Sequence, residues 1–530
     1  MASTSTAGTR RLLRASLRHE RQSFAPWIML PTALSMSSVL IYPWLFPDIA
    51  DRKALAATVG SNPALGLVFG PAFDLSTRDG FNAWRSLALG GFIAALGMIS
   101  VVVKATREQE GSGQAELLAA GVLGRSARPL TALLMAVLCS TAIGVVSWVA
   151  TALCGGDWQS SALLSAGFTV TGWMFAAIAL VGSQVGADAR AAITISVSIL
   201  GILFVMRGFL YSIDSPAWTT WINPLGWIEE TRPATGDHWS PLLLGVGLTA
   251  IVSGIGFALQ NSRDFGQGLI ASRPGPARGA VKSPLGLASR LNRTPIASWT
   301  VAFVGLGVVF GYFTRSVRGL LTTNPELAAI FASGAATPSD LVSAFATTIL
   351  GIIGIIASVA GVQIVNRVRT EELEDRAESV LATAVHRLRY LGTNVAVALA
   401  ASGMFMVIAG GLVGIFASTA HIGIGFGDAV LQAVATIPAV WTVVAFAVLV
   451  LGGRPLVRPA IWLGVLVSFV MTVLGPSFKL PGWALGFSPF HHVPDVVAAG
   501  SNSWGLRWVG VVGVAFLALG FAGFRRRDIP

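Results

Sequence analysis

Stretches of about 20 apolar residues recur from one end of this chain to the other, and a helix of about 20 apolar residues crosses the hydrocarbon layer of a membrane. The polar segments between them are too short to form a sizeable soluble domain. Composition agrees, because 54% of the residues are hydrophobic and only 12% are charged, with a mean hydropathy of +0.71. These values exclude a water-soluble protein and predict an all-α polytopic membrane protein.

The apolar runs predict about twelve transmembrane helices, six in each half of the chain. The expected spans are 24–46, 84–104, 130–153, 162–184, 191–211, 241–259, 297–313, 342–366, 393–417, 429–451, 459–477 and 506–524. The corresponding segments are a cytoplasmic amphipathic helix at 1–23, a first six-helix half at 24–260, a cytoplasmic linker at 261–296, a second half at 297–524 and a cytoplasmic tail at 525–530.

The net charge of +11 does not require a nucleic-acid partner, because the basic residues gather in short loops between spans. With both termini inside, cytoplasmic segments collect about 26 of the 36 Lys and Arg residues. We therefore expect both termini of the chain to be cytoplasmic.

The two halves contain a sequence repeat. After the second span, Arg107, Glu110, Glu116 and Arg125 match Arg369, Glu372, Glu378 and Arg387 at one constant offset without a gap. Before the last span of each half, Trp218, Pro224 and Trp239 match Trp483, Pro489 and Trp504 at a second constant offset. Equal span numbers and orientations make this a parallel repeat, which predicts a transport path between the halves.

The paired inner loops at 107–128 and 369–389 carry charges at helical spacing and are too polar to enter lipid. They are either solvated connecting helices or a paired docking surface for a dimeric cytoplasmic motor, and we favour the second because the motif occurs in each half. The candidate coupling residues are Arg107, Glu108, Glu110, Glu116, Arg125, Arg369, Glu371, Glu372, Glu378 and Arg387.

The N-terminal segment places Arg10, Arg14, Arg18 and Arg21 on one helical face, which predicts an amphipathic helix at the inner membrane surface. It either anchors the chain to anionic lipid or also contacts a cytoplasmic partner.

The outer segments at 212–240 and 478–505 are rich in Trp, Pro and Gly. They either anchor the chain at the membrane interface or form short re-entrant helices over the transport path. The candidate gate residues are Trp218, Trp221, Pro224, Trp227, Glu229, Glu230, Arg232, Trp483, Pro489, His491 and His492. We expect Glu229, Glu230 and Arg232 to pair with one another, and Arg207 to reach the outer interface rather than a transport path.

The chain lacks a G-x-x-x-x-G-K-[S/T] phosphate loop, and it has no Cys and His cluster at metal-ligand spacing. We therefore expect no catalytic residue, no metal and no nucleotide site on this chain. A proton-coupled transporter would need ionisable residues deep in the spans. A lipid-modifying enzyme would need a polar cluster, for which only His491, His492 and Asp495 offer a hint, and a non-transporting scaffold is a further alternative.

Four features together resemble the fused, twelve-span permeases of actinobacterial type-2 ABC exporters, the tetronasin-type polyketide antibiotic exporters. They are the amphipathic N-terminal helix, the R-E-Q-E-G-S-G-Q-A-E-L-L loop from Arg107, the W-I-N-P-L-G-W-I-E-E-T-R-P segment at Trp221–Pro233 and the closing Arg527-Asp528. In the second half, the segment from Ser488 to His492 replaces the segment from Asn223 to Trp227.

The resemblance implies a permease in the bacterial plasma membrane that exports antibiotics or other amphipathic compounds. It implies two copies of a separate ABC ATPase as partners, with ATP and Mg on that partner and no nucleic acid. By position, Glu110, Glu116, Glu372 and Glu378 would form the coupling surface. The alternative is a proton-coupled secondary drug transporter.

Overall fold

The computed structural model describes residues 6–527 with gaps. The gaps are 60–65, 67, 115, 117–122, 213–215, 263–267, 271–282, 324–337, 420–424, 454–457, 475–480 and 497–501. The described residues form helices and no strand, which confirms the predicted all-α membrane fold. The chain divides into two compact units, Met1–Gly275 and Pro276–Pro530. Residues 263–267 and 271–282 of the predicted linker at 261–296 lie outside the described residues, and its described end includes helix α13 (Pro284–Leu291).

Within the described ranges, 11 helices are long and apolar enough to cross a membrane. The expected span at 459–477 corresponds to a shorter stretch of mixed helix type, made of η3 (Arg458–Trp462), α20 (Leu463–Phe469) and the π-helical η4 (Val470–Leu474). The proline at position 459 has no backbone N–H to donate, and it lies in the 3-10 turn that begins this stretch.

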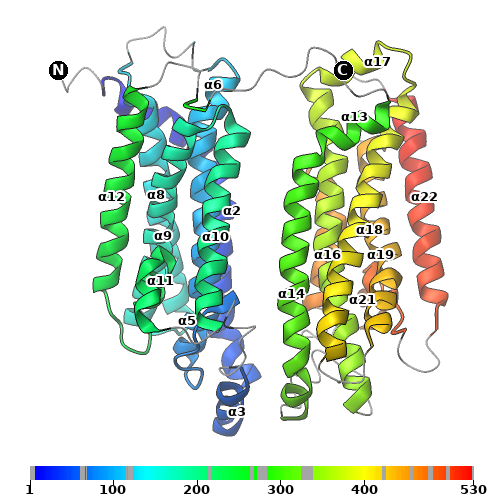
Figure 1. Cartoon of the computed structure of the whole chain (residues 1–530), viewed down its shortest axis with the longest axis horizontal. Helices are drawn as coiled ribbons and strands as arrows, with labels where there is room; N and C mark the ends of the chain where they lie inside the picture. Colours follow the sequence, from blue (N-terminus) through cyan, green and yellow to red (C-terminus); the bar gives the residue numbers. More distant parts are fainter. Residues whose placement is uncertain are drawn as a thin grey trace. The chain divides into compact units, whose positions relative to one another are not determined.

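The first unit is a helical bundle with α9 at its centre (Figure 1). Its elements are α2 (Thr9–Leu45), α3 (Ile49–Val59), α5 (Arg78–Val103), η1 (Lys104–Glu108), α6 (Gln109–Gly111), α8 (Ala127–Leu153), α9 (Trp158–Val185), α10 (Ala189–Ser212), η2 (Ala217–Ile222), α11 (Pro224–Glu229) and α12 (Ser240–Asn261). Helix α9 packs against α5, α8, α10 and α12. Within this unit, α6 lies at one end of the bundle and α3 and α11 lie at the other.

The second unit is a bundle in which α19 packs against α16, α18 and α22 (Figure 1). Its elements, besides those given above, are α14 (Arg293–Thr323), α16 (Pro338–Leu373), α17 (Arg376–Leu381), α18 (Arg387–Thr419), α19 (Phe426–Gly453), α21 (Gly482–Leu485), η5 (Pro489–His492) and α22 (Trp504–Arg526). Within this unit, α13 and α17 lie at one end, and α21 lies at the other.

Small residues allow the closest helix contacts, as they do in membrane bundles where lipid offers little hydrophobic drive for helix association. A Cβ atom on Gly452 of α19 would overlap the backbone of Gly520 on α22. Likewise, a Cβ on Gly90 of α5 would meet the ring of Phe168 on α9. Within each unit, these glycines therefore allow the paired helices, α19 with α22 and α5 with α9, to lie closer than larger side chains would permit.

The basic N-terminal segment continues into the first span as one helix, α2. The helix runs without a break through residues 23 and 24, where the sequence predicts the end of one segment and the start of the next. Leu13, Leu17 and Phe24 pack against the core of the first unit. The basic segment is therefore packed against the bundle as part of the same helix as the first span.

Candidate functional site

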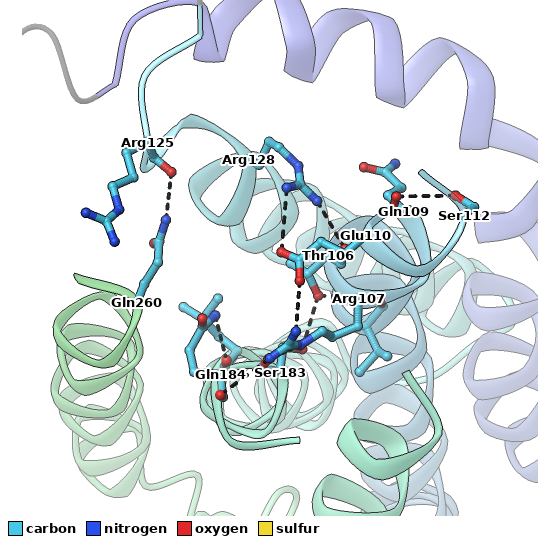
Figure 2. A network of polar contacts seen from close by, with 12 residues as sticks. Thr106, Arg107, Gln109, Glu110, Ser112, Arg125, Arg128, Ser183, Gln184 and Gln260 are labelled. Carbon is cyan, nitrogen blue, oxygen red and sulfur yellow. Dashed lines mark hydrogen bonds and ion pairs between the residues drawn. The ribbon is translucent and has the colours of Figure 1, made fainter. Parts of the chain in front are cut away.

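The inner loop of the first unit is held from inside by a buried arginine. At the end of α5, the chain passes through the π-helical turn η1, which carries Arg107. The Arg107 guanidinium donates to the backbone carbonyl of Ser183 on α9, and its Nη1 lies 2.9 Å from Glu110 Oε2. The side chains of Arg107 and Glu110 are 1% and 8% exposed, so this ion pair is largely shielded from solvent (Figure 2). The loop is thus tied to the central helix of its bundle.

Glu110 also contacts a second arginine, from the following helix. Arg128 on α8 lies 3.5 Å from Glu110 Oε1, and it donates to the carbonyl of Thr106 at 3.1 Å. The Thr106 hydroxyl lies 3.1 Å from the Ser183 hydroxyl (Figure 2). Three segments of the chain, the loop, α8 and α9, therefore meet at one buried carboxylate.

The second unit repeats the first arginine and the carboxylate at matching positions, with a second arginine from a different helix. Arg369 Nη1 lies 2.9 Å from Glu372 Oε2, with the same spacing in sequence as Arg107 and Glu110. The second arginine here is Arg527, at the end of α22, which forms an ion pair with Glu372. The side chain of Glu372 is fully buried. In both units, a carboxylate between two arginines fixes the end of the span that leads into the loop, and we call this arrangement the arginine lock.

Among the residues described, the loop of the second unit contains a second buried carboxylate, Glu371, whereas the loop of the first unit does not. Glu371 accepts from the Tyr390 hydroxyl at 2.9 Å and pairs with Arg367 at 3.1 Å. Tyr390 occupies the position that matches Arg128 in the first unit. The residue at this position thus contacts an acidic loop residue in both units, although its chemistry differs.

The candidate coupling residues divide into a buried and an exposed set. The buried set is Arg107, Glu110, Arg369, Glu371 and Glu372, whose side chains point into their bundles. The exposed set is Glu108, Glu116, Arg125, Glu378 and Arg387. Glu110 and Glu372 thus form ion pairs inside their own bundles, whereas the exposed set lies at the surface of the described residues, and the role of all ten residues in coupling stays a prediction.

The outer segment of the first unit combines a buried short helix with exposed tryptophans. In α11, Leu225, Gly226 and Ile228 are buried, and the Asn223 side chain caps the helix by accepting from Leu225 N. The Asn223 amide also donates to the carbonyl of Leu203 on α10 at 2.7 Å. The exposed tryptophans of the segment are Trp218, Trp221 and Trp239. The short helix thus packs into the bundle as a re-entrant element would, and the exposed indoles suit an interfacial belt.

An ion pair between Arg207 and Glu229 is buried beneath this segment. Arg207 on α10 is 2% exposed and forms an ion pair with Glu229 of α11. It also donates to the carbonyl of Val68 at 2.9 Å. Arg207 therefore lies inside the bundle, and the expectation that it reaches the outer interface is wrong. Glu229 pairs with Arg207 rather than with Arg232.

Glu230 and Arg232 do form the pair expected from sequence, at 2.8 Å. This pair is partly exposed and lies beside the buried Arg207 and Glu229. A surface pair of this kind contributes little stability by itself.

The outer segment of the second unit repeats the helix cap. The Ser488 side chain accepts from Phe490 N, at the position that matches Asn223. Trp483 and His491 are exposed, and His492 Nε2 lies 3.0 Å from the Gly486 carbonyl oxygen. Partial burial lowers the pKa of His491, and the His492 imidazole beside it lowers that pKa further. Among the described residues, no three His, Cys, Asp or Glu side chains gather as metal ligands would.

Sequence reasoning missed Arg128, Tyr390 and Arg527, which complete the buried contacts. Arg128 and Tyr390 share one repeat position but differ in residue type, so identity between the halves does not reveal them. The repeat nevertheless offered one signal, because Arg527 matches a basic residue, Arg263, after the last span of the first half.

Comparisons with known proteins match both halves of the chain. Residues 49–231 match a family model described as ABC-2 type transporter. Residues 281–525 match the C-terminal domain of the multidrug efflux system permease Rv1217c. Over its whole length, the chain is similar to the multidrug efflux system permease protein Rv1217c of Mycobacterium tuberculosis. The two are 32% identical over 535 residues, which cover 98% of this chain and 95% of that protein.

Proposed function

Because this chain belongs to the family of ABC-2 type multidrug efflux permeases, we propose that it is the membrane subunit of an exporter driven by a separate ATPase. The chain itself is a transport permease of the membrane and carries out no bond chemistry in this proposal. Two copies of the ATPase would bind it, and these would hold the ATP and Mg. The substrates would be antibiotics or other amphipathic compounds, and the direction would be outward.

The finer assignments from sequence belong to the same proposal. They are the fused twelve-span architecture, the tetronasin-type antibiotic exporter class, the bacterial plasma membrane as location and the cytoplasmic position of both termini. The concentration of Lys and Arg in the predicted inner loops supports this orientation.

The observation that carries the proposal is the arginine lock, which occurs once in each unit: its first arginine and its carboxylate stand at matching positions, and its second arginine comes from α8 in the first unit and from the end of α22 in the second. In each unit it fixes the end of a long span to the start of a loop that also carries an exposed acidic side chain, Glu116 in the first unit and Glu378 in the second. A rigid joint is what force transmission requires, because a loose loop would absorb the motion of a partner.

The proposed mechanism follows from this joint. Closure of an ATPase dimer would push on the two exposed loop segments. The lock would pass the displacement to α5 in the first unit and α16 in the second. Because α9 and α19 are packed on several sides within their bundles, each bundle would respond as a body and alter access to the substrate path.

The buried pair of Arg207 and Glu229 is the observation that favours a proton-coupled transporter. Buried ionisable residues within membrane bundles are often part of proton pathways. The same pair also fits a structural role, since it holds α10 and α11 together. The two functions differ in their energy source, which is ATP hydrolysis for the ATPase-driven exporter and a proton gradient for the proton-coupled transporter.

The test uses the full chain, co-purified with an ABC ATPase subunit from the same bacterium, in proteoliposomes. We expect ATP-dependent transport of rhodamine 6G and drug-stimulated ATP hydrolysis. Glu116→Arg and Glu378→Arg should abolish the stimulation while the complex still assembles, because like charges at a docking surface oppose a productive contact. Transport driven by a proton gradient without ATP would reject the proposal.

Asp48→Arg is the matched control, because it also reverses the charge of an exposed residue. Asp48 directly precedes α3, which lies at the opposite end of the first unit from α6 and the loop that carries Glu116. It should leave the stimulation unchanged. If Glu116→Arg and Glu378→Arg also leave the stimulation unchanged, these loops do not couple the ATPase to the permease.

A further inference from the structure

The second unit contains a pocket of about 470 Å³ between α19, α20, α22 and the outer segment. This volume lies in the range of pockets that bind drug-sized molecules. Four aromatic side chains line it, namely Phe446, Phe487, Trp508 and Phe516. Phe487 and Trp508 are also largely exposed, so the pocket is open at the surface of the bundle.

One polar atom in this apolar lining has no partner. Ser468 on α20 lines the pocket and is 1% exposed. Its hydroxyl has no hydrogen-bond partner among the residues that the structure describes. A serine within a membrane helix normally bonds to the carbonyl four residues earlier. A buried hydroxyl without a partner is costly, and a bound ligand with one polar atom would satisfy it.

The repeat explains how this wall of the pocket arises. In the first unit, Trp227 Nε1 donates to the Trp221 carbonyl at 2.7 Å. At the matching positions of the second unit, His492 Nε2 lies 3.0 Å from the Gly486 carbonyl oxygen. The contact is the same, and it indicates that Nε2 carries the proton, but an imidazole is smaller than an indole. His492 lines the pocket at the position where the first unit has the larger Trp227.

We propose that this pocket binds aromatic, largely apolar small molecules that carry one hydrogen-bond acceptor. The aromatic side chains would contact the rings of the ligand, and the Ser468 hydroxyl would donate to the acceptor. The use of this pocket in drug transport rests on the proposed function; the binding itself does not. A lipid acyl chain has the same apolar character, but its hydrocarbon tail carries no hydrogen-bond acceptor for the Ser468 hydroxyl.

The test is photolabelling of the full chain in phospholipid nanodiscs with benzophenone, which has two aromatic rings and one carbonyl acceptor. We expect mass spectrometry to find the label in peptides of α20 and α22. Val512→Trp, which fills the pocket, should abolish this labelling. Val511→Trp is the matched control, because the neighbouring Val511 is exposed and is not part of the lining. Equal labelling in both variants would overturn the proposal.

Ser468→Ala tests the hydrogen bond and should reduce labelling about 2-fold to 10-fold, which is the equilibrium effect of one hydrogen bond of ordinary strength. Labelling that is unchanged in Ser468→Ala and displaced by oleate would assign the pocket to acyl chains and overturn the proposal. The labelling needs no ATPase, so a failure of the transport proposal would leave this result intact.

Discussion

Neutralising Glu372 should loosen the inner loop of the second unit without unfolding the bundle. The change is Glu372→Gln, which keeps the shape of the side chain but removes its charge. Glu372 is fully buried and is the shared partner of Arg369 and Arg527, so the variant leaves two arginines without their counter-ion.

The magnitude follows from these contacts. Removing one partner of a buried ion pair costs about 3–5 kcal/mol when the other charge stays buried. Both arginines here keep a side-chain exposure of about a tenth, and Arg527 lies at the end of α22, where it can turn toward water. The glutamine also retains part of the hydrogen bonding. We therefore expect the free energy of local opening to fall by about 1.5–3 kcal/mol.

Hydrogen–deuterium exchange of the full chain in nanodiscs measures this opening directly. Three amides report on the loop, because Glu374 N, Asp375 N and Ala382 N donate to Thr370, Glu372 and Glu378 carbonyls, respectively. Their exchange should become about 10-fold to 150-fold faster, since about 1.4 kcal/mol corresponds to tenfold. Glu378→Gln, at an exposed residue of the same segment, should change it little. Unchanged exchange of these three amides in Glu372→Gln would refute the conclusion that the arginine lock holds the loop in place.

Two further variants probe the packing of each unit. Arg207→Ala should lower thermal stability strongly, by about 3–5 kcal/mol, because Glu229 remains buried without its partner. The double variant with Glu229→Ala should recover part of the lost stability. Fluorescence-detected gel filtration after heating measures both effects. Equal losses in the single and double variants would contradict the buried pair. Gly452→Leu should push α19 away from α22 and lower the stability of the second unit by about 1–3 kcal/mol or more. Gly453→Leu is the control: a Cβ at this position meets open space, so this variant should keep its stability in the same assay. Similar stability of the two leucine variants would show that the helices do not pack as closely as described.

The sequence by itself determined the class of the protein and the places where function should be sought. Apolar runs of membrane length can only be satisfied as helices in lipid, so the fold class followed from composition and periodicity. The repeat pointed to the inner loops, because the same charged residues recur in both polar segments. This match can be read from the sequence without knowing how the spans pack. The expected ABC-type permease family is confirmed by the relative that covers nearly the whole chain.

Only the tertiary structure decided which charged residues face inward. Glu110 and Glu116 lie in the same short loop, and nothing in the sequence separates the carboxylate that pairs with Arg107 and Arg128 from the one that is exposed. Likewise, Arg207 is buried because α11 folds back against α10 and places Glu229 beside it, although the two residues are 22 positions apart on the chain. Burial of a charge depends on which helix supplies its partner, and that information resides in packing rather than in local sequence.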